Sequence, residues 1–120
     1  MALNIEKEIH NEAIIYAKDN IVYLEGEIDQ TDPDRFLVPF FKNIILQMEE
    51  MVYIDVRKLE YLNSAGIECI LEFIINRKPG TKIVIKIDKL KNWQKGAVDV
   101  IKSLDEKHIS LLKQSMENGS

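Results

Sequence analysis

The sequence predicts an α/β fold in which helices pack against a mixed, largely parallel sheet, with the element order β-β-α-β-α-β-α-β. Three observations predict it. Two β-rich runs open the chain, strand-like and helical apolar spacings then alternate, and 120 residues are enough for one domain with a buried core. We expect a single domain with its core at about residues 13–113 and flexible ends at residues 1–12 and 114–120.

The first two elements form a predicted hairpin. Ala13–Ala17 and Ile21–Ile28 are rich in β-branched and aromatic residues, and the polar stretch Lys18–Asn20 between them is typical of a turn. The residues before Ala13 are polar and mixed, and they predict no regular element.

The first helix is predicted from Thr31–Asp34 onward. This stretch combines capping side chains, a proline in the first turn and early acidic residues. Pro39 interrupts the pattern, so it either kinks the helix or marks its true first turn. The apolar residues at helical spacing are Phe36, Leu37, Phe40, Phe41, Ile44, Ile45 and Met48.

Strands and helices alternate through the rest of the chain. A nearly continuous apolar run is typical of a strand buried on both faces, whereas apolar residues three or four apart indicate a helix. The predicted elements are a strand at Met51–Val56, a helix at Ser64–Arg77, a strand at Thr81–Ile87, a helix at Leu90–Leu104 and a last strand at His108–Leu112.

The predicted topology brings two polar segments to one end of the sheet. Parallel strands joined by right-handed crossovers have their carboxyl ends together, and ligands bind beyond those ends in open sheets. Asp29 follows the second predicted strand, and Asn63 and Ser64 follow the third. We therefore expect Asp29 to lie near Asn63 and Ser64.

Composition excludes several classes of protein. The net charge of −4 and the pI near 5.2 disfavour nucleic acid as a direct partner, because phosphate binding needs a basic face. No apolar run approaches the roughly 18 residues of a membrane span, and the N-terminus lacks the layout of a signal peptide. We expect a cytoplasmic protein without membrane contact.

No catalytic or metal-binding constellation stands out. His10 and His108 are the only histidines, and neither has a serine or cysteine nucleophile nearby in the sequence. Cys69 is the only cysteine and lies on an apolar helical stripe, so we expect a small buried side chain. Gly66 stands alone in its turn, which does not support a phosphate-binding loop. We expect neither a metal nor a cofactor.

Ser64 is the most informative residue. It lies where a helix begins, and the first amide groups of a helix lack intrahelical partners and carry partial positive charge. Its hydroxyl is therefore either an ordinary N-cap, which stabilises by about 1 kcal/mol, or a phosphate acceptor at a site favourable for anions. The local sequence leaves both interpretations open.

Two other features have alternative interpretations. Trp93 at the start of the third helix either fills the core or anchors a protein partner. The lysine-rich stretch at residues 78–95 is either a solvated face or a surface for an acidic partner.

Two motifs resemble the STAS domains of bacterial anti-sigma-factor antagonists. The stretch Ile54–Ile67 is similar to the family pattern of an apolar strand ending in Asp-apolar, a short loop, an aromatic-apolar pair, Asp-Ser-Ser/Thr-Gly and an apolar helix. Gly26–Asp29 is similar to the Gly-x-Leu/Ile-Asp that ends the family's second strand. The resemblance covers about residues 13–113. Asn-Ser-x-Gly-Ile followed later by Trp-Gln also resembles a branch of small cyanobacterial-type STAS-like regulators.

The resemblance implies a regulator that works by protein binding and is not an enzyme. Ser64 matches the serine that a partner kinase of the ATP-binding type, itself the anti-sigma factor, phosphorylates. Phosphorylation breaks that complex, and a metal-dependent serine phosphatase resets it. The implied partner-binding positions are Asp29, Asn63, Ala65 and Gly66, and Asp29 matches an acid expected to orient the kinase or its nucleotide.

The chain departs from the family pattern at two of these positions. Asn63 replaces the acid before the serine, which keeps its size but removes its charge. Ala65 replaces a second hydroxyl residue, so any phosphate in this turn should be on Ser64.

The resulting hypothesis is an anti-sigma-factor-antagonist-like regulator, a monomer or weak dimer, switched by phosphorylation of Ser64. One alternative is a STAS scaffold that is not phosphorylated. The other is a small-ligand binder or enzyme with a pocket near Asp29 and Ser64.

Overall fold

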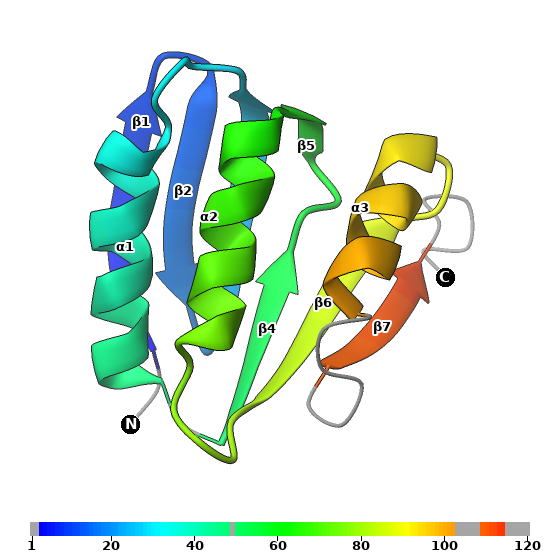
Figure 1. Ribbon diagram of the computed structural model, residues 1–120. Helices are drawn as coiled ribbons and strands as arrows, with labels where there is room; N and C mark the ends of the chain where they lie inside the picture. Colours follow the sequence, from blue (N-terminus) through cyan, green and yellow to red (C-terminus); the bar gives the residue numbers. More distant parts are fainter. Residues whose placement is uncertain (1–2, 49, 103–108, 115–120) are drawn as a thin grey trace.

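The computed structural model describes residues 3–48, 50–102 and 109–114, and within them the chain forms seven strands and three helices (Figure 1). In chain order the elements are β1 (Ile5–His10), β2 (Ala13–Lys18), β3 (Ile21–Ile28), α1 (Asp34–Gln47), β4 (Met51–Asp55), β5 (Leu59–Leu62), α2 (Ser64–Ile75), β6 (Lys82–Asp88), α3 (Asn92–Lys102) and β7 (Ile109–Gln114).

The sheet is mixed, as the sequence predicted. Its strand order is β1-β2-β3-β4-β6-β7, with β5 paired to β3. The β1–β2 and β2–β3 pairs are antiparallel, whereas β3–β4, β4–β6 and β6–β7 are parallel. The predicted hairpin is confirmed, and Asp19 and Asn20 adopt the positive φ angles that a tight hairpin turn requires.

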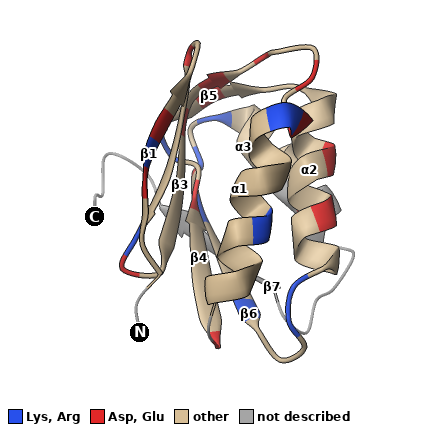
Figure 2. Cartoon of the chain, turned by 90° about the vertical axis from the view of Figure 1, so that its left-hand side faces the viewer, with Lys and Arg blue, Asp and Glu red and all other residues tan. Residues whose placement is uncertain are grey.

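All three helices lie on one face of the sheet (Figures 1 and 2). The core fills the space between the helices and the sheet. Alternate strand residues such as Val22, Leu24 and Ile85 point toward the helices and are buried. Phe41 of α1 and Phe73 of α2 stack with their ring centroids 4.7 Å apart, which joins the two helices over the sheet.

The expectation of a flexible end at residues 1–12 is wrong for Ile5–His10, which forms β1. This strand lies at one edge of the sheet and its residues are only exposed or partly buried, so its sequence lacks a continuous apolar pattern. It is nevertheless tied to the core, because the ring of His10 stacks on Phe36 of α1 at a centroid distance of 4.4 Å.

A further strand, β5, lies between the predicted strand Met51–Val56 and the predicted helix Ser64–Arg77, where the sequence indicated a loop. β5 continues the path of β4 along β3 after a break, with Gly26 opposite Leu59 and Ile28 opposite Leu62. Leu59 and Leu62 are buried while the two residues between them are exposed, so the segment shows no period-two alternation. The missing alternation is why the sequence did not predict it.

The start of α1 differs from the predicted capped start. The N-cap is Pro33, and no side chain caps the helix. Asp32 instead forms an ion pair with Arg35, and its carbonyl oxygen accepts the Arg35 amide. Pro39 lies inside the helix, so it does not mark the first turn.

The C-terminal elements agree with the prediction where they are described. α3 lies within the predicted helix, Trp93 is partly buried against the core, and β7 pairs with β6. The expectation of a flexible end at residues 114–120 is wrong for Gln114, which is the last residue of β7. The rest of that end, and the predicted positions Ser103, Leu104 and His108, lie outside the described residues. Among the described helices, none is long and apolar enough to cross a membrane.

Candidate functional site

Asn63, rather than Ser64, is the N-cap of α2. Its side-chain Oδ1 accepts a hydrogen bond from the Gly66 amide at 2.8 Å. Its Nδ2 donates to the main-chain oxygen of Gln30 at 2.7 Å, and its own amide donates to the Ile28 oxygen at 3.0 Å. The interpretation of Ser64 as the cap is therefore wrong, because the preceding side chain occupies that role.

Ser64 is the first residue of α2 and is exposed. In the described part of the chain, its hydroxyl makes no hydrogen bond. The amides of Ser64 and Ala65 belong to the first turn, where a helix has no internal acceptors and its dipole favours negative charge. The site therefore presents a free hydroxyl to solvent beside backbone groups that favour an anion.

Asp29 lies in the segment that contacts the cap. It follows β3 and is exposed, and both of its chain neighbours accept hydrogen bonds from Asn63. The predicted proximity of the β3 end to the start of α2 is confirmed by these bonds and by the pairing of Ile28 with Leu62.

Gly66 has a packing role. It is buried, and a Cβ at this position would lie 2.5 Å from Leu62 Cδ1 and 3.2 Å from Ile28 Cγ2. The absence of a side chain lets the first turn of α2 approach β3 and β5 closely. Gly66 is therefore covered, and Ser64 is the exposed residue at the start of this turn.

Gly26, in the second motif, also has a structural reason. Its φ of 82° is in the region that favours glycine, and a Cβ there would collide with the main-chain oxygen of Glu12. The pairing of β3 with β5 shifts register at this residue. Gly26 thus lets β3 pass close to the main chain at Glu12, between β1 and β2. Asp29 and Gln30 follow at the end of β3 and lie at the site.

Gln94, which the sequence singled out only as part of a Trp-Gln pair, holds the connection leading into the site. Gln94 of α3 is fully buried, and its Nε2 donates to the oxygens of Val56 at 2.8 Å and Leu59 at 3.0 Å. Its Oε1 accepts the amide of Asp88 at 2.9 Å. The two bonds from Nε2 supply a donor to main-chain oxygens at the break between β4 and β5, and the third holds the end of β6.

Two ion pairs reinforce this connection. Asp55, buried at the end of β4, pairs with Arg57 through two side-chain bonds of 3.1 and 2.8 Å, and this hydrogen bonding raises the pKa of the Arg57 guanidinium. Lys91 Nζ donates to the Arg57 oxygen and to the Glu60 carboxylate, both at 2.7 Å. Near the end of β5, Tyr61 exposes about half of its surface to solvent.

The described residues offer no group suited to holding a metal ion, and their one cysteine is buried. They hold no cluster of three or more histidine, cysteine or acidic side chains that would suit a metal ion. Cys69 is buried as predicted, and burial raises the pKa of its thiol, which keeps it protonated and unreactive.

Comparison with known proteins identifies the fold. No family model and no curated protein matches the chain. A solved anti-sigma factor antagonist from Mycobacterium paratuberculosis superposes with a TM-score of 0.62 at 14% identity, covering 97% of this chain and 88% of that chain. The chain therefore has the mixed α/β fold of the STAS domains that its motifs resemble.

Proposed function

We propose that this protein is a STAS-type regulator that acts in the manner of an anti-sigma-factor antagonist, and that phosphorylation of Ser64 switches its binding to a protein partner. The observation that carries the proposal is the exposed Ser64 hydroxyl at the start of α2, left free because Asn63 caps the helix. The fold shared with an anti-sigma factor antagonist supports it.

The physical effect of the phosphate is local. It adds a charge of about −2 where the helix dipole and first-turn amides favour an anion, so α2 stays folded. A partner that docks flush against Ser64 meets new charge and bulk, and loses affinity through repulsion and desolvation. Phosphorylation therefore acts as a binding switch without a change of fold.

The proposed docking surface surrounds Ser64. It takes in Asp29, whose chain neighbours bond to Asn63, and Ala65, which follows Ser64 in the chain. Tyr61, with 51% of its surface exposed, offers an aromatic contact of the kind that anchors protein interfaces. The partner we propose is a serine kinase of the ATP-binding type that is also the anti-sigma factor. A metal-dependent serine phosphatase would reset the switch in the cytoplasm, and the chain itself is substrate rather than enzyme.

Intact mass measured after incubation with such a kinase and ATP tests the site. We expect one added phosphate on the wild type and on the control Ser103→Ala, and none on Ser64→Ala. Phosphorylation of Ser64→Ala to the wild-type level would overturn the assignment.

Calorimetry of partner binding separates the switch from a STAS scaffold that is not phosphorylated. Ser64→Asp should weaken binding at least about tenfold, since a charge placed in an interface costs more than 1.4 kcal/mol. Equal affinity of Ser64→Asp and the wild type would favour the scaffold. Ser64→Ala should bind like the wild type, which shows that the hydroxyl itself is not the contact.

A further inference from the structure

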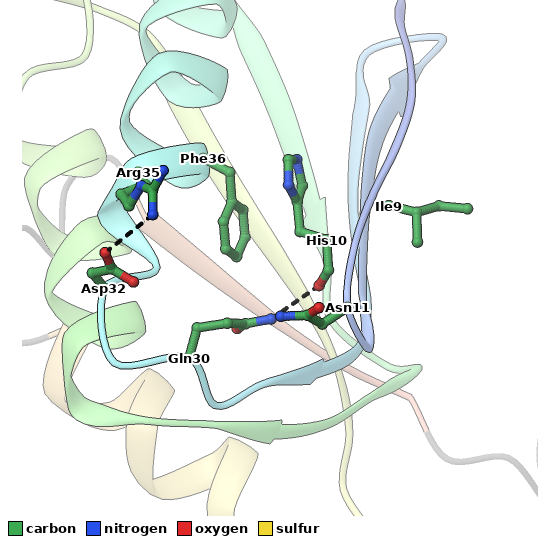
Figure 3. A pocket seen from close by; sticks show the side chains of 7 residues that line it. All are labelled: Ile9, His10, Asn11, Gln30, Asp32, Arg35 and Phe36. Atoms are coloured by element: carbon green, nitrogen blue, oxygen red, sulfur yellow. Dashed lines mark hydrogen bonds and ion pairs between the residues drawn. The ribbon is translucent and has the colours of Figure 1, made fainter.

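A polar groove lies beside the candidate site, between the start of α1 and the β1–β2 hairpin (Figure 3). Its volume is about 490 Å³, within the range of sites for small molecules. In Figure 3, Asp32 and Arg35 form one wall, His10 and Asn11 the opposite wall, Phe36 the back and Gln30 the floor, while the Ile9 side chain points away.

Gln30 on the floor has an unsatisfied acceptor. Its Nε2 donates to the main-chain oxygen of His10 at 2.9 Å, which fixes the orientation of the amide. Its Oε1 is buried and has no hydrogen-bond partner among the described residues. The terminal torsion of glutamine is soft, so a ligand N–H donor in the groove can turn Oε1 toward itself in exchange for the bond between Nε2 and His10. A buried acceptor without a donor is a feature that native structures rarely keep.

The wall formed by Asp32 and Arg35 carries two charges of opposite sign that hold each other weakly. Arg35 Nη1 and Asp32 Oδ2 are 3.7 Å apart, and the two side chains are 79% and 58% exposed. An exposed pair at this distance gains little from its attraction, so a ligand can displace it with small loss. The back of the groove is rigid by comparison, because Phe36 is held by its stack with His10.

We propose that this groove binds a small zwitterion of the amino-acid type. The ammonium group would donate to Gln30 Oε1 and to the Asp32 carboxylate, and the carboxylate would accept from the Arg35 guanidinium, whose fork suits bidentate binding. The ligand satisfies the unpartnered acceptor and exchanges a weak internal ion pair for two external ones. The remaining volume accommodates an amino-acid side chain or a second residue.

Gln30 also connects the groove to Ser64. Its main-chain oxygen accepts a hydrogen bond from Asn63 Nδ2, and the Oδ1 atom of the same side chain caps α2. A ligand that orders Gln30 therefore also orders the segment to which the capping side chain is bonded. This coupling rests on the proposed function, whereas the binding does not. Amino-acid binding should therefore change the rate at which the kinase modifies Ser64.

Thermal unfolding of the unphosphorylated protein, with each standard amino acid at about 10 mM in turn, tests the binding by mass action. We expect at least one amino acid to raise the midpoint. Arg35→Gln and Asp32→Asn, which change exposed side chains, should each abolish the rise, while the control Lys42→Gln on α1 and Ser64→Ala should keep it. Acetylation of the ligand's amino group or amidation of its carboxylate should remove the rise in the midpoint. A parallel measurement with dipeptides distinguishes a site for free amino acids from one that also takes the ends of peptides.

Two outcomes would overturn the proposal: no amino acid or dipeptide raises the midpoint, or the rise persists in both groove variants. Because no kinase is present, neither outcome bears on Ser64. A kinase assay with the identified ligand then tests the coupling separately, since Arg35→Gln should respond to ATP and kinase but not to the amino acid.

Discussion

At the scale of single residues, Asn63 explains why an amide stands where the STAS pattern has an acid. Its Oδ1 caps α2 and its Nδ2 donates to the Gln30 oxygen, so both ends of the side chain are used. A carboxylate could accept from Gly66 but could not donate to Gln30, and it would place negative charge against that oxygen. Asparagine at this position therefore suits the β3–α1 connection of this chain, because the Gln30 oxygen there accepts a hydrogen bond that an acid could not donate.

Replacement of Asn63 should separate these two bonds. Asn63→Ala removes both, and we expect the free energy of unfolding to fall by about 1–3 kcal/mol, because a cap and a second hydrogen bond are lost. The free energy of unfolding should fall by less in Asn63→Asp, since the aspartate can still cap the helix. Urea denaturation measures both values, and Asn43→Ala, which removes an exposed amide on α1, is the control. Equal losses in Asn63→Asp and Asn63→Ala would show that the bond to Gln30, not the cap, dominates.

Two glycines in helices provide a matched pair. Gly66→Ala should destabilise by about 1–3 kcal/mol, because the new methyl group meets Leu62 and Ile28 in a packed interior. Gly96→Ala in α3 should instead stabilise by about 0.5–1 kcal/mol, since nothing lies within 4 Å of its Cβ position and alanine favours a helix. Denaturation midpoints of the two variants should move in opposite directions. A midpoint for Gly66→Ala at or above that of the wild type would contradict the close approach of α2 to the sheet.

At the scale of elements, the break between β4 and β5 determines how the chain enters the site. β4 pairs with both β3 and β6, whereas β5 pairs with β3 alone. The main-chain groups freed by this divergence are bonded by Gln94 from α3. The third helix, distant in sequence, thus supports the strand that ends one residue before the Asn63 cap.

Gln94→Met keeps the volume of this side chain but removes its three hydrogen bonds. We expect a loss of at least about 2 kcal/mol in the free energy of unfolding, since buried main-chain groups are left unsatisfied. Lys95→Met, at the exposed neighbouring position, should change stability by no more than about 0.5 kcal/mol. Hydrogen exchange should also show faster exchange in β5 for Gln94→Met. If the amide exchange rates of β5 were the same in Gln94→Met and the wild type, the pairing with β3 alone would be enough to hold β5.

The elements with strong periodicity could be predicted from the sequence, and the others could not for identifiable reasons. Ala13–Ala17, Ile21–Ile28 and Met51–Val56 combine β-rich composition with buried faces, and their strands are present. β1 is a charged edge strand and β5 buries only its two ends, so neither has a local pattern.

The candidate site was likewise predicted from the sequence only in part. The sequence placed Asp29 near Asn63 and Ser64 through strand topology, because chain order alone carries that information. The cap interpretation of Ser64, one of the two that the sequence left open, named the wrong residue of the turn, since asparagine and serine are equally good caps and only the bond to Gly66 distinguishes them. The role of Gln94 depends on contacts across nearly forty residues of sequence, which no local pattern reveals.

At the scale of the whole molecule, the sheet has an edge that must be kept from pairing with a second copy. β1 is that edge, and its central residues are Glu6, Lys7 and Glu8, with both charge signs visible on it in Figure 2. Two copies related by a two-fold axis would pair antiparallel about a common residue. Centred on Lys7, such a pair opposes lysine to lysine and Glu6 to Glu8, and like charges directly opposite each other destabilise a sheet.

Removal of these charges should therefore expose the edge. We expect the wild type to sediment as the 13.9 kDa chain, and the triple variant Glu6→Thr, Lys7→Val, Glu8→Thr to form a dimer whose population rises with concentration. The control Glu68→Thr, Glu72→Thr removes two exposed charges from α2 and should remain monomeric, because it uncovers no unpaired strand. A monomeric triple variant would mean that the register shift between Ile5 and Glu8, rather than charge, protects the edge, since a bulge alone prevents a regular ladder.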